Sequence, residues 1–151
     1  MAATGRRLLA LIAVSAAALC HAAKPPDQSD AARRCLADIA SALSASNPTD
    51  AMSPFAKSFA GYDTLSDYFV GLAKAFDLAS EIDVTDEEDN PAETKLTVHW
   101  TLTLTDSQTN LSESRGAEIK VRLLLKGGKW KIVDFSPIAL FDPQPQPSPR
   151  H

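Results

Sequence analysis

Hydrophobic and polar residues alternate through much of the second half of the chain. One run has apolar side chains at every second position: Leu96, Val98, Trp100, Leu102 and Leu104. A second run repeats the pattern at Ala117, Ile119, Val121, Leu123 and Leu125. The intervening positions are polar: Thr97, His99, Thr101 and Thr103 in the first run, and Glu118, Lys120 and Arg122 in the second. Because successive side chains of a strand point to opposite faces, both runs predict long antiparallel strands with one apolar face.

Apolar residues in the first half of the chain recur at helical spacing instead, and such a helix can cover the apolar face of a sheet. The first stripe consists of Ala32, Cys35, Leu36, Ile39, Ala40 and Leu43. Ser29 or Asp30 can cap this helix, because a short side-chain oxygen accepts a first-turn N–H. Asn47-Pro48 ends it near Ser46, since a residue before proline avoids the helical conformation.

A second helix is predicted to open at Thr64-Leu65-Ser66-Asp67, a variant capping box with Asp67 in place of Glu or Gln. Its buried stripe consists of Leu65, Tyr68, Phe69, Leu72 and Phe76. Between the two helices, Phe55 and Phe59 are expected at the bottom of the core. From Asp77 the period changes to two, which predicts a first strand with Leu78, Ser80, Ile82 and Val84 on its inner face.

Turn signals separate the predicted strands. Residues 86–91 form an acidic turn, residues 106–114 a polar loop, and Gly127-Gly128 a tight hairpin, since paired glycines accept positive φ angles. Pro137 stops the last strand, and Ile138, Leu140 and Phe141 are expected to pack back onto the sheet edge. The fold class that follows is α+β, with N-terminal helices packed on an antiparallel sheet of about four to five strands.

The N-terminus has the pattern of a secretory signal peptide. Arg6 and Arg7 precede an apolar run over residues 8–19, and cleavage is expected after Ala22. Leu19 disfavours a lipid anchor at Cys20, because lipoprotein signals carry a small residue there. We therefore expect a signal peptide at 1–22, an extended leader at 23–29, one domain at 30–142 and a Pro-rich disordered tail at 143–151. The expected location is periplasmic or secreted, with no membrane span.

Charge and cysteine content narrow the classes of partner. The chain has 15 Lys and Arg, 19 Asp and Glu and a net charge of −4, and loss of the signal peptide lowers the charge to about −6. No basic patch is present, which argues against nucleic acid or an anionic membrane as partner. After cleavage Cys35 is the single cysteine, so no internal disulfide is expected. Its place on an apolar stripe favours a buried small hydrophobe over a reactive thiol.

The order of elements and the final hairpin together resemble a known superfamily. Helices precede long strands, and the last hairpin has the sequence GGKWKIVDFSP, with Trp130 opening the final strand and a proline closing it. Residues 30–141 resemble the nuclear transport factor 2-like superfamily, which includes ketosteroid isomerase and polyketide cyclase-like proteins, and in particular its exported bacterial members. The resemblance implies a cone-shaped, cystatin-like fold, a curved sheet around helices with a pocket at the open end. It implies no single function, since the fold hosts enzymes, binders and assembly modules.

Asp134 is the first candidate for a functional group. Pairing across the Gly127-Gly128 turn sets Leu123 opposite Ile132 and Val121 opposite Asp134, which places this carboxylate on the apolar face. There it needs a raised pKa or a hydrogen-bond partner. The resemblance implies that acids and tyrosines inside the cone carry the chemistry, and Tyr62 and Tyr68 are the phenols available. The alternative is that Asp134 lies at a wet rim near the strand end.

Other candidates have ordinary structural interpretations beside the functional ones. Five residues could line a ligand pocket or simply pack the core: Trp100, Trp130, Phe76, Tyr68 and Asp134. His99 falls on the polar face, where a solvated histidine is favoured over a general base. The acidic residues Asp83, Asp86, Glu87, Glu88 and Asp89 lack the glycine and final glutamate of a calcium loop. We therefore expect no metal site and no cofactor.

Three functions are compatible with these residues. The leading hypothesis is an exported, non-catalytic domain that binds a small apolar ligand or a protein. The alternative is an isomerase- or cyclase-like enzyme that uses Asp134 with Tyr68 or Tyr62. A third is an adaptor recruited through the Pro-rich tail. The polar sheet face could also join a homodimer through Thr97, Thr101, Thr103, Lys120 and Arg122.

Overall fold

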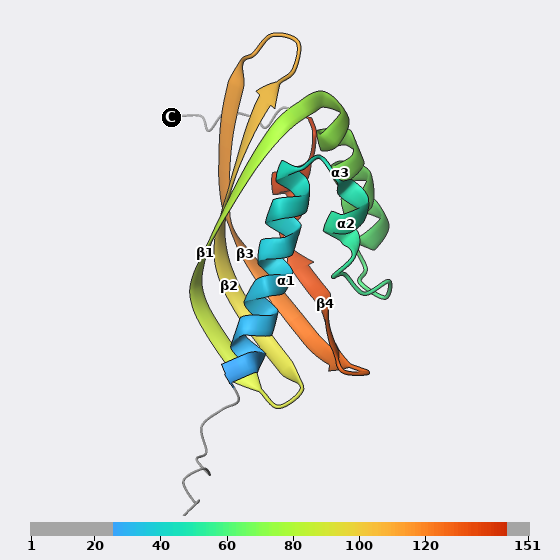
Figure 1. Cartoon of the computed structure of the whole chain (residues 1–151), viewed down its shortest axis with the longest axis vertical. Helices are drawn as coiled ribbons and strands as arrows, with labels where there is room; N and C mark the ends of the chain where they lie inside the picture. Colours follow the sequence, from blue (N-terminus) through green and yellow to red (C-terminus); the bar gives the residue numbers. More distant parts are fainter. Residues whose placement is uncertain (1–25, 145–151) are drawn as a thin grey trace, which may run out of the picture.

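The computed structural model describes residues 26–144 and shows helices packed on one antiparallel sheet (Figure 1). The helices are α1 (Pro26–Ser44), α2 (Pro48–Met52) and α3 (Tyr62–Ala75). They precede β1 (Phe76–Asn90), β2 (Glu93–Asp106), β3 (Ser112–Lys126) and β4 (Lys129–Ser136), and a short helix η2 (Ala139–Phe141) is the last element of the described residues. The sheet has four strands in the order β1-β2-β3-β4, which confirms the predicted α+β class. The predicted signal peptide and most of the predicted tail, residues 145–151, lie outside the described residues.

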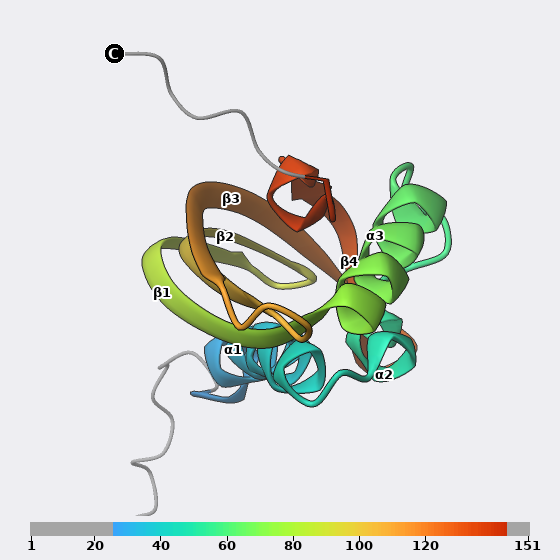
Figure 2. The same ribbon diagram turned by 90° about the horizontal axis from the view of Figure 1, so that it is seen from above.

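The predicted alternation holds along the sheet. On β2, the apolar positions are at most 1% exposed: Leu96, Val98, Trp100, Leu102 and Leu104. On β3, Ile119, Val121 and Leu123 are buried, whereas Leu125 near the hairpin is 39% exposed. Seen from above, β1, β2 and β3 curl around one side, and the helices complete the other (Figure 2). We refer to the sheet face that meets the helices as the inner face and to the opposite one as the outer face.

Two predicted helix starts are wrong. α1 begins at Pro26, so residues 26–29 are helical and not an extended leader; proline is tolerated in the first turn of a helix. α3 begins at Tyr62 with Gly61 as its N-cap and without a side-chain cap bond. Thr64 and Asp67 therefore lie inside the helix and form no capping box. The extra turn is stabilised by Leu65 N–H donating to the Gly61 carbonyl at 2.9 Å and by burial of Leu65.

The predicted acidic turn is also wrong. β1 continues to Asn90, which pairs with Glu93, and the turn is formed by Pro91 and Ala92. Pairing with β2 satisfies the backbone groups of this segment, and Thr94 Oγ1 donates to Asp89 Oδ1 at 2.8 Å. The ladder shifts register between Val84 and Asp86, a β-bulge that reverses which side chains face inward.

Candidate functional site

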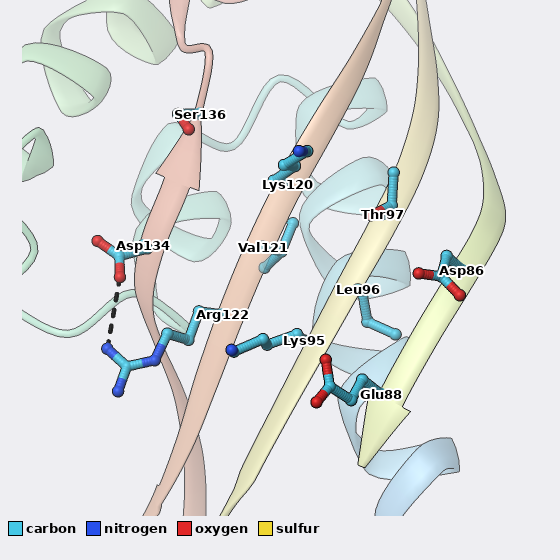
Figure 3. A pocket seen from close by; sticks show the side chains of 10 residues that line it. All are labelled: Asp86, Glu88, Lys95, Leu96, Thr97, Lys120, Val121, Arg122, Asp134 and Ser136. Carbon is cyan, nitrogen blue, oxygen red and sulfur yellow. Dashed lines mark hydrogen bonds and ion pairs between the residues drawn. The ribbon is translucent and has the colours of Figure 1, made fainter.

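A groove of about 240 Å³ lies on the outer face of the sheet. We call it the outer groove, and its lining comes from all four strands: Asp86, Glu88, Lys95, Leu96, Thr97, Lys120, Val121, Arg122, Asp134 and Ser136. Figure 3 shows charged side chains from several strands around it, with the helices behind the sheet. The outward positions on β2 and β3 follow from the two-residue period of the sheet, whereas Asp86, Glu88 and Asp134 face outward because of the bulges in β1 and β4.

Ion pairs order one end of the outer groove. Arg122 Nη2 lies 3.4 Å from Glu93 Oε2, and Arg122 Nη1 lies 3.5 Å from Asp134 Oδ2. Lys95 Nζ lies 3.6 Å from Glu93 Oε1. The hydrogen bond from Arg122 holds the pKa of Glu93 below its ordinary value, and Glu93 in turn raises the pKa of Arg122. A carboxylate whose pKa is lowered is a poor general base at neutral pH, so this cluster suits recognition better than proton transfer.

The other end of the groove holds Lys120, Thr97 and Asp86. Among residues 26–144, Lys120 and Asp86 form no ion pair, and both are exposed. They flank Thr97 in one row across the sheet, since Asp86 pairs with Thr97 and Thr97 pairs with Lys120. The groove thus presents one acidic and one basic group available to a partner.

Asp134 lies on the outer face, which corrects the prediction that it points into the core. β3 and β4 shift register between Arg122 and Leu123, so Val133 is an extra residue and Asp134 pairs with Arg122. Val121 pairs with Phe135 instead. The side chain of Asp134 is 67% exposed, whereas Phe135 is 2% exposed. The bulge is favourable because it buries an aromatic ring and leaves the carboxylate in water.

The acidic residues of β1 are divided between the two faces of the sheet. Asp86 and Glu88 point outward into the groove, whereas Glu87 pairs with Arg33 of α1 at 3.1 Å and Asp89 accepts from Thr94. Within the described range, no three His, Cys, Asp or Glu side chains gather as metal ligands. His99 is exposed on the outer face as predicted, where it pairs across the ladder with Glu118.

The interior of the cone is filled by aromatic side chains. Trp100, Phe69, Phe135 and Phe141 are each at most 2% exposed. Their rings meet edge to face, with centroids 5.8 Å apart for Trp100 and Phe135 and 5.3 Å apart for Trp100 and Phe141. Trp100 Nε1 donates to Ser80 Oγ at 2.6 Å, which satisfies its polar group. Side chains of the protein itself thus occupy the region where the resemblance implies a pocket.

The remaining predicted pocket residues pack around this core. Tyr62 and Tyr68 on α3, Phe76 at the start of β1 and Trp130 on β4 are half-buried and contact it. Asp134 is on the opposite face of the sheet, so the acid and the tyrosines do not converge on a common point. The predicted arrangement of Asp134 with Tyr62 or Tyr68 is not formed.

Comparison with solved structures identifies the fold, whereas comparison of the sequence finds no match. No protein-family model matches the sequence, and no curated protein sequence matches it significantly. A conserved protein from Planctomyces limnophilus matches the structure with a TM-score of 0.68 at 8% identity, covering 72% of this chain and 93% of that chain. A ketosteroid isomerase-like protein from Erwinia carotovora atroseptica matches with a TM-score of 0.60 at 8% identity, covering 73% and 94%. A protein of unknown function with a cystatin-like fold from Nostoc punctiforme matches with a TM-score of 0.56 at 15% identity, covering 74% and 90%.

The chain has the nuclear transport factor 2-like fold. At these identities the likeness shows the fold alone, and function must be argued from the residues of the site. Within residues 26–144, no helix combines the length and the apolar composition needed to cross a membrane.

The sequence analysis did not identify Arg115 on β3 as a buried charged residue of this nuclear transport factor 2-like fold. It pairs with Leu102 and points inward, and its side chain is 5% exposed. The signal was present, because continuing the inward positions of β3 back from Ala117 reaches Arg115. A buried guanidinium requires several acceptors, and the carbonyl groups of Leu140 and Gln144 are among those that it finds.

Proposed function

We propose that the protein is an exported, non-catalytic binding domain whose binding surface is the outer face of the sheet. The single observation that carries the proposal is the contrast between the two faces. The inner face is packed with aromatic rings, whereas the outer face carries a groove with charged residues that are available to a partner. Export rests on the signal-peptide pattern of residues 1–22.

A second copy of the chain is the partner that the outer face fits best, because its charge pattern is self-complementary. Asp86, Thr97 and Lys120 form one row across β1, β2 and β3, and Glu88, Lys95 and Arg122 form the next. A two-fold axis parallel to β2 sets β1 of one copy against β3 of the other. Asp86 then faces Lys120 of the second copy, and Glu88 faces Arg122 of the second copy. Because the interface is two-fold symmetric, each of these contacts is formed twice.

The centre of the same face allows two sheets to approach closely. Thr101 pairs with Gly116 and Thr103 pairs with Ser114, so small side chains form two consecutive rows on the outer face. Packed sheets lie about 10 Å apart, and rows of small residues permit this spacing without displacing bulky groups. The polar character of these rows indicates a reversible, hydrated interface and not an obligate one.

Light scattering on the purified protein tests the proposal. We expect a concentration-dependent mass that approaches twice that of the monomer and falls at high salt. Lys120→Glu or Asp86→Lys alone should weaken the dimer roughly tenfold or more, because two like-charge contacts replace two favourable ones at ~1 kcal/mol each. The double variant should restore the dimer, since the contacts are again of opposite charge.

Lys126→Glu, at the hairpin outside the groove, is the matched control for net charge and should leave the mass unchanged. A protein that stays monomeric at high concentration would overturn the proposal of a second copy as partner. So would a double variant that is no better than either single one.

A further inference from the structure

A second hollow lies at the edge of the sheet, where the loop that follows α2 runs beside β4 and Phe55 forms a parallel bridge with Ile132 (Figure 1). Its volume is about 480 Å³, and we call it the edge cavity. Its lining comes from α2, this loop, the first residue of α3 and β4, and includes Met52, Phe55, Ala56, Lys57, Tyr62 and Lys131. No described residue of β1, β2 or β3 lines it, so it is separate from the aromatic interior of the cone and from the outer groove.

Backbone hydrogen bonds hold the wall of the edge cavity in place. Ile132 N–H donates to the Pro54 carbonyl at 2.9 Å, and Ala56 N–H donates to the Ile132 carbonyl at 2.8 Å. Phe55 N–H donates to the Met52 carbonyl at 3.0 Å, which ties the loop to α2. Because the loop is bonded on both sides, the cavity is pre-formed, and a ligand that enters it has little ordering to impose.

Apolar side chains make up much of this lining. Met52, Phe55 and Ala56 are buried, and the half-buried Tyr62 packs against the core and also lines the cavity. A volume of about 480 Å³ falls within the range of ordinary small-molecule sites, roughly 300–1,000 Å³. The outer groove, at about 240 Å³, is smaller than these sites. The edge cavity is therefore the better candidate for a small molecule with an apolar body.

The charged side chains that line the edge cavity are both basic, namely Lys57 and Lys131. Lys131 Nζ donates to the Ser53 carbonyl at 2.8 Å, which positions this ammonium group and leaves its other N–H groups available. Lys57 is exposed and forms no ion pair within residues 26–144, and the Tyr62 hydroxyl has no hydrogen bond among these residues. The cavity thus offers positive charge and free donors to an occupant.

The hollow on the other side of Ser53 has the opposite charge. It lies between α1 and α2, where Asp38 and Asp50 line it and no described Lys or Arg does. An anion is repelled there and attracted to the edge cavity, so the two neighbouring hollows differ in the sign of the ligand that they favour.

We propose that the edge cavity binds a small carboxylate with an apolar body. The carboxylate lies between the ammonium groups of Lys57 and Lys131 and accepts a hydrogen bond from the Tyr62 hydroxyl, while the apolar body covers Met52 and Phe55. An ionised carboxylate has two acceptor oxygens and no donor, which matches a rim of donors, whereas a cation meets two like charges. The site is independent of the proposed dimer, because it shares no lining residue with the outer groove.

Titration of the purified protein with 3-phenylpropionate, followed by backbone amide resonances, tests the proposal. We expect saturable shifts at Ser53, Lys57 and Tyr62, with Trp100 and Thr97 unchanged, and a dissociation constant in the millimolar range that is usual for a molecule of this size. The uncharged 3-phenylpropanamide has the same shape and should bind roughly fivefold more weakly, because it lacks the attraction to two partly exposed lysines. Equal binding of the two compounds, shifts at Trp100 or Thr97 in place of the cavity, or no shifts at millimolar concentration would overturn the proposal.

Substitutions at the rim of the cavity test the role of each donor. Lys57→Gln and Lys131→Gln should each weaken binding of 3-phenylpropionate roughly threefold, and Tyr62→Phe should do so by a similar factor, since each removes one contact to the carboxylate. Lys126→Gln, at the exposed hairpin, removes the same charge outside the cavity and is the matched control with unchanged binding. If Lys131→Gln does not fold because it loses the bond to Ser53, the exposed Lys57 still decides the matter. Equal binding by Lys57→Gln and Lys126→Gln would contradict the proposal.

Discussion

Substitution of Phe135 should destabilise the protein far more than substitution of its neighbour Asp134. Phe135 is 2% exposed, and its ring lies 5.1 Å from Phe55 and 5.8 Å from both Trp100 and Phe141. Rigid rings on several sides cannot collapse into the space left by Phe135→Ala. We therefore expect this variant to lose about 4 kcal/mol of unfolding free energy, in the upper part of the usual range.

Asp134→Ala should lose less than about 1 kcal/mol, because it removes one exposed ion pair with Arg122. Phe135→Leu, which fills much of the volume, should lie between the two. Chemical denaturation followed by tryptophan fluorescence gives all three free energies. If Asp134→Ala proved as destabilising as Phe135→Ala, the assignment of a bulge at Val133 would be refuted, because Asp134 would then face the core.

Three further predictions concern separate parts of the molecule. Hydrogen bonds from Thr109 and Gln108 hold the pKa of Asp106 below its ordinary value, so its contribution to stability is present above about pH 4 and is lost as pH falls through the lowered pKa. Asp106→Asn should flatten the acid limb of a stability–pH curve, and an unchanged limb would contradict this. Burial raises the pKa of the Cys35 thiol, so iodoacetamide should react more slowly with native protein than with unfolded protein; equal rates would refute the burial. Gly128 has a φ of +80°, so Gly128→Ala should cost about 1 kcal/mol in a denaturation experiment, whereas Gly127→Asn should be nearly neutral; equal costs would argue against this turn.

The sequence was sufficient to predict the elements that repeat a simple period. Leu96 through Leu104 and Ile119 through Leu123 alternate over enough residues for the buried face to be predictable. The glycine turn was predictable too, since Gly127 and Gly128 both adopt positive φ angles. These features depend on local chemistry, which a sequence displays directly.

The features that were mispredicted depend on competition between distant groups. The bulge at Val133 arises because burying Phe135 against Phe55 and Trp100 is more favourable than continuous alternation, and these rings are far away in sequence. α3 starts early at Tyr62 without the capping box because tertiary packing outweighs a local signal. Arg115 was overlooked because its acceptors are carbonyl groups of residues 140–144, which carry no side-chain signature.

The candidate site was predictable only in part. Lys120 and Arg122 were expected on a polar sheet face, and both line the outer groove. Asp134 was predicted either to point into the cone or to lie at a wet rim near the strand end, and it lines the groove on the outer face. Lys120 lies in one row with Asp86, and Arg122 lies in one row with Glu88. These rows could not be predicted, because they depend on the register of β1, which shifts at a bulge at Thr85.

A dilution series followed by backbone amide resonances tests the central claim most directly, because it locates the interacting surface residue by residue. The account predicts that concentration-dependent shifts cluster at outward residues of the sheet, including Thr97, Thr101 and Lys120, while α3 and Trp100 remain unchanged. Shifts confined to α3 and residues 138–144, or no shifts at any concentration, would contradict a binding surface on the outer face.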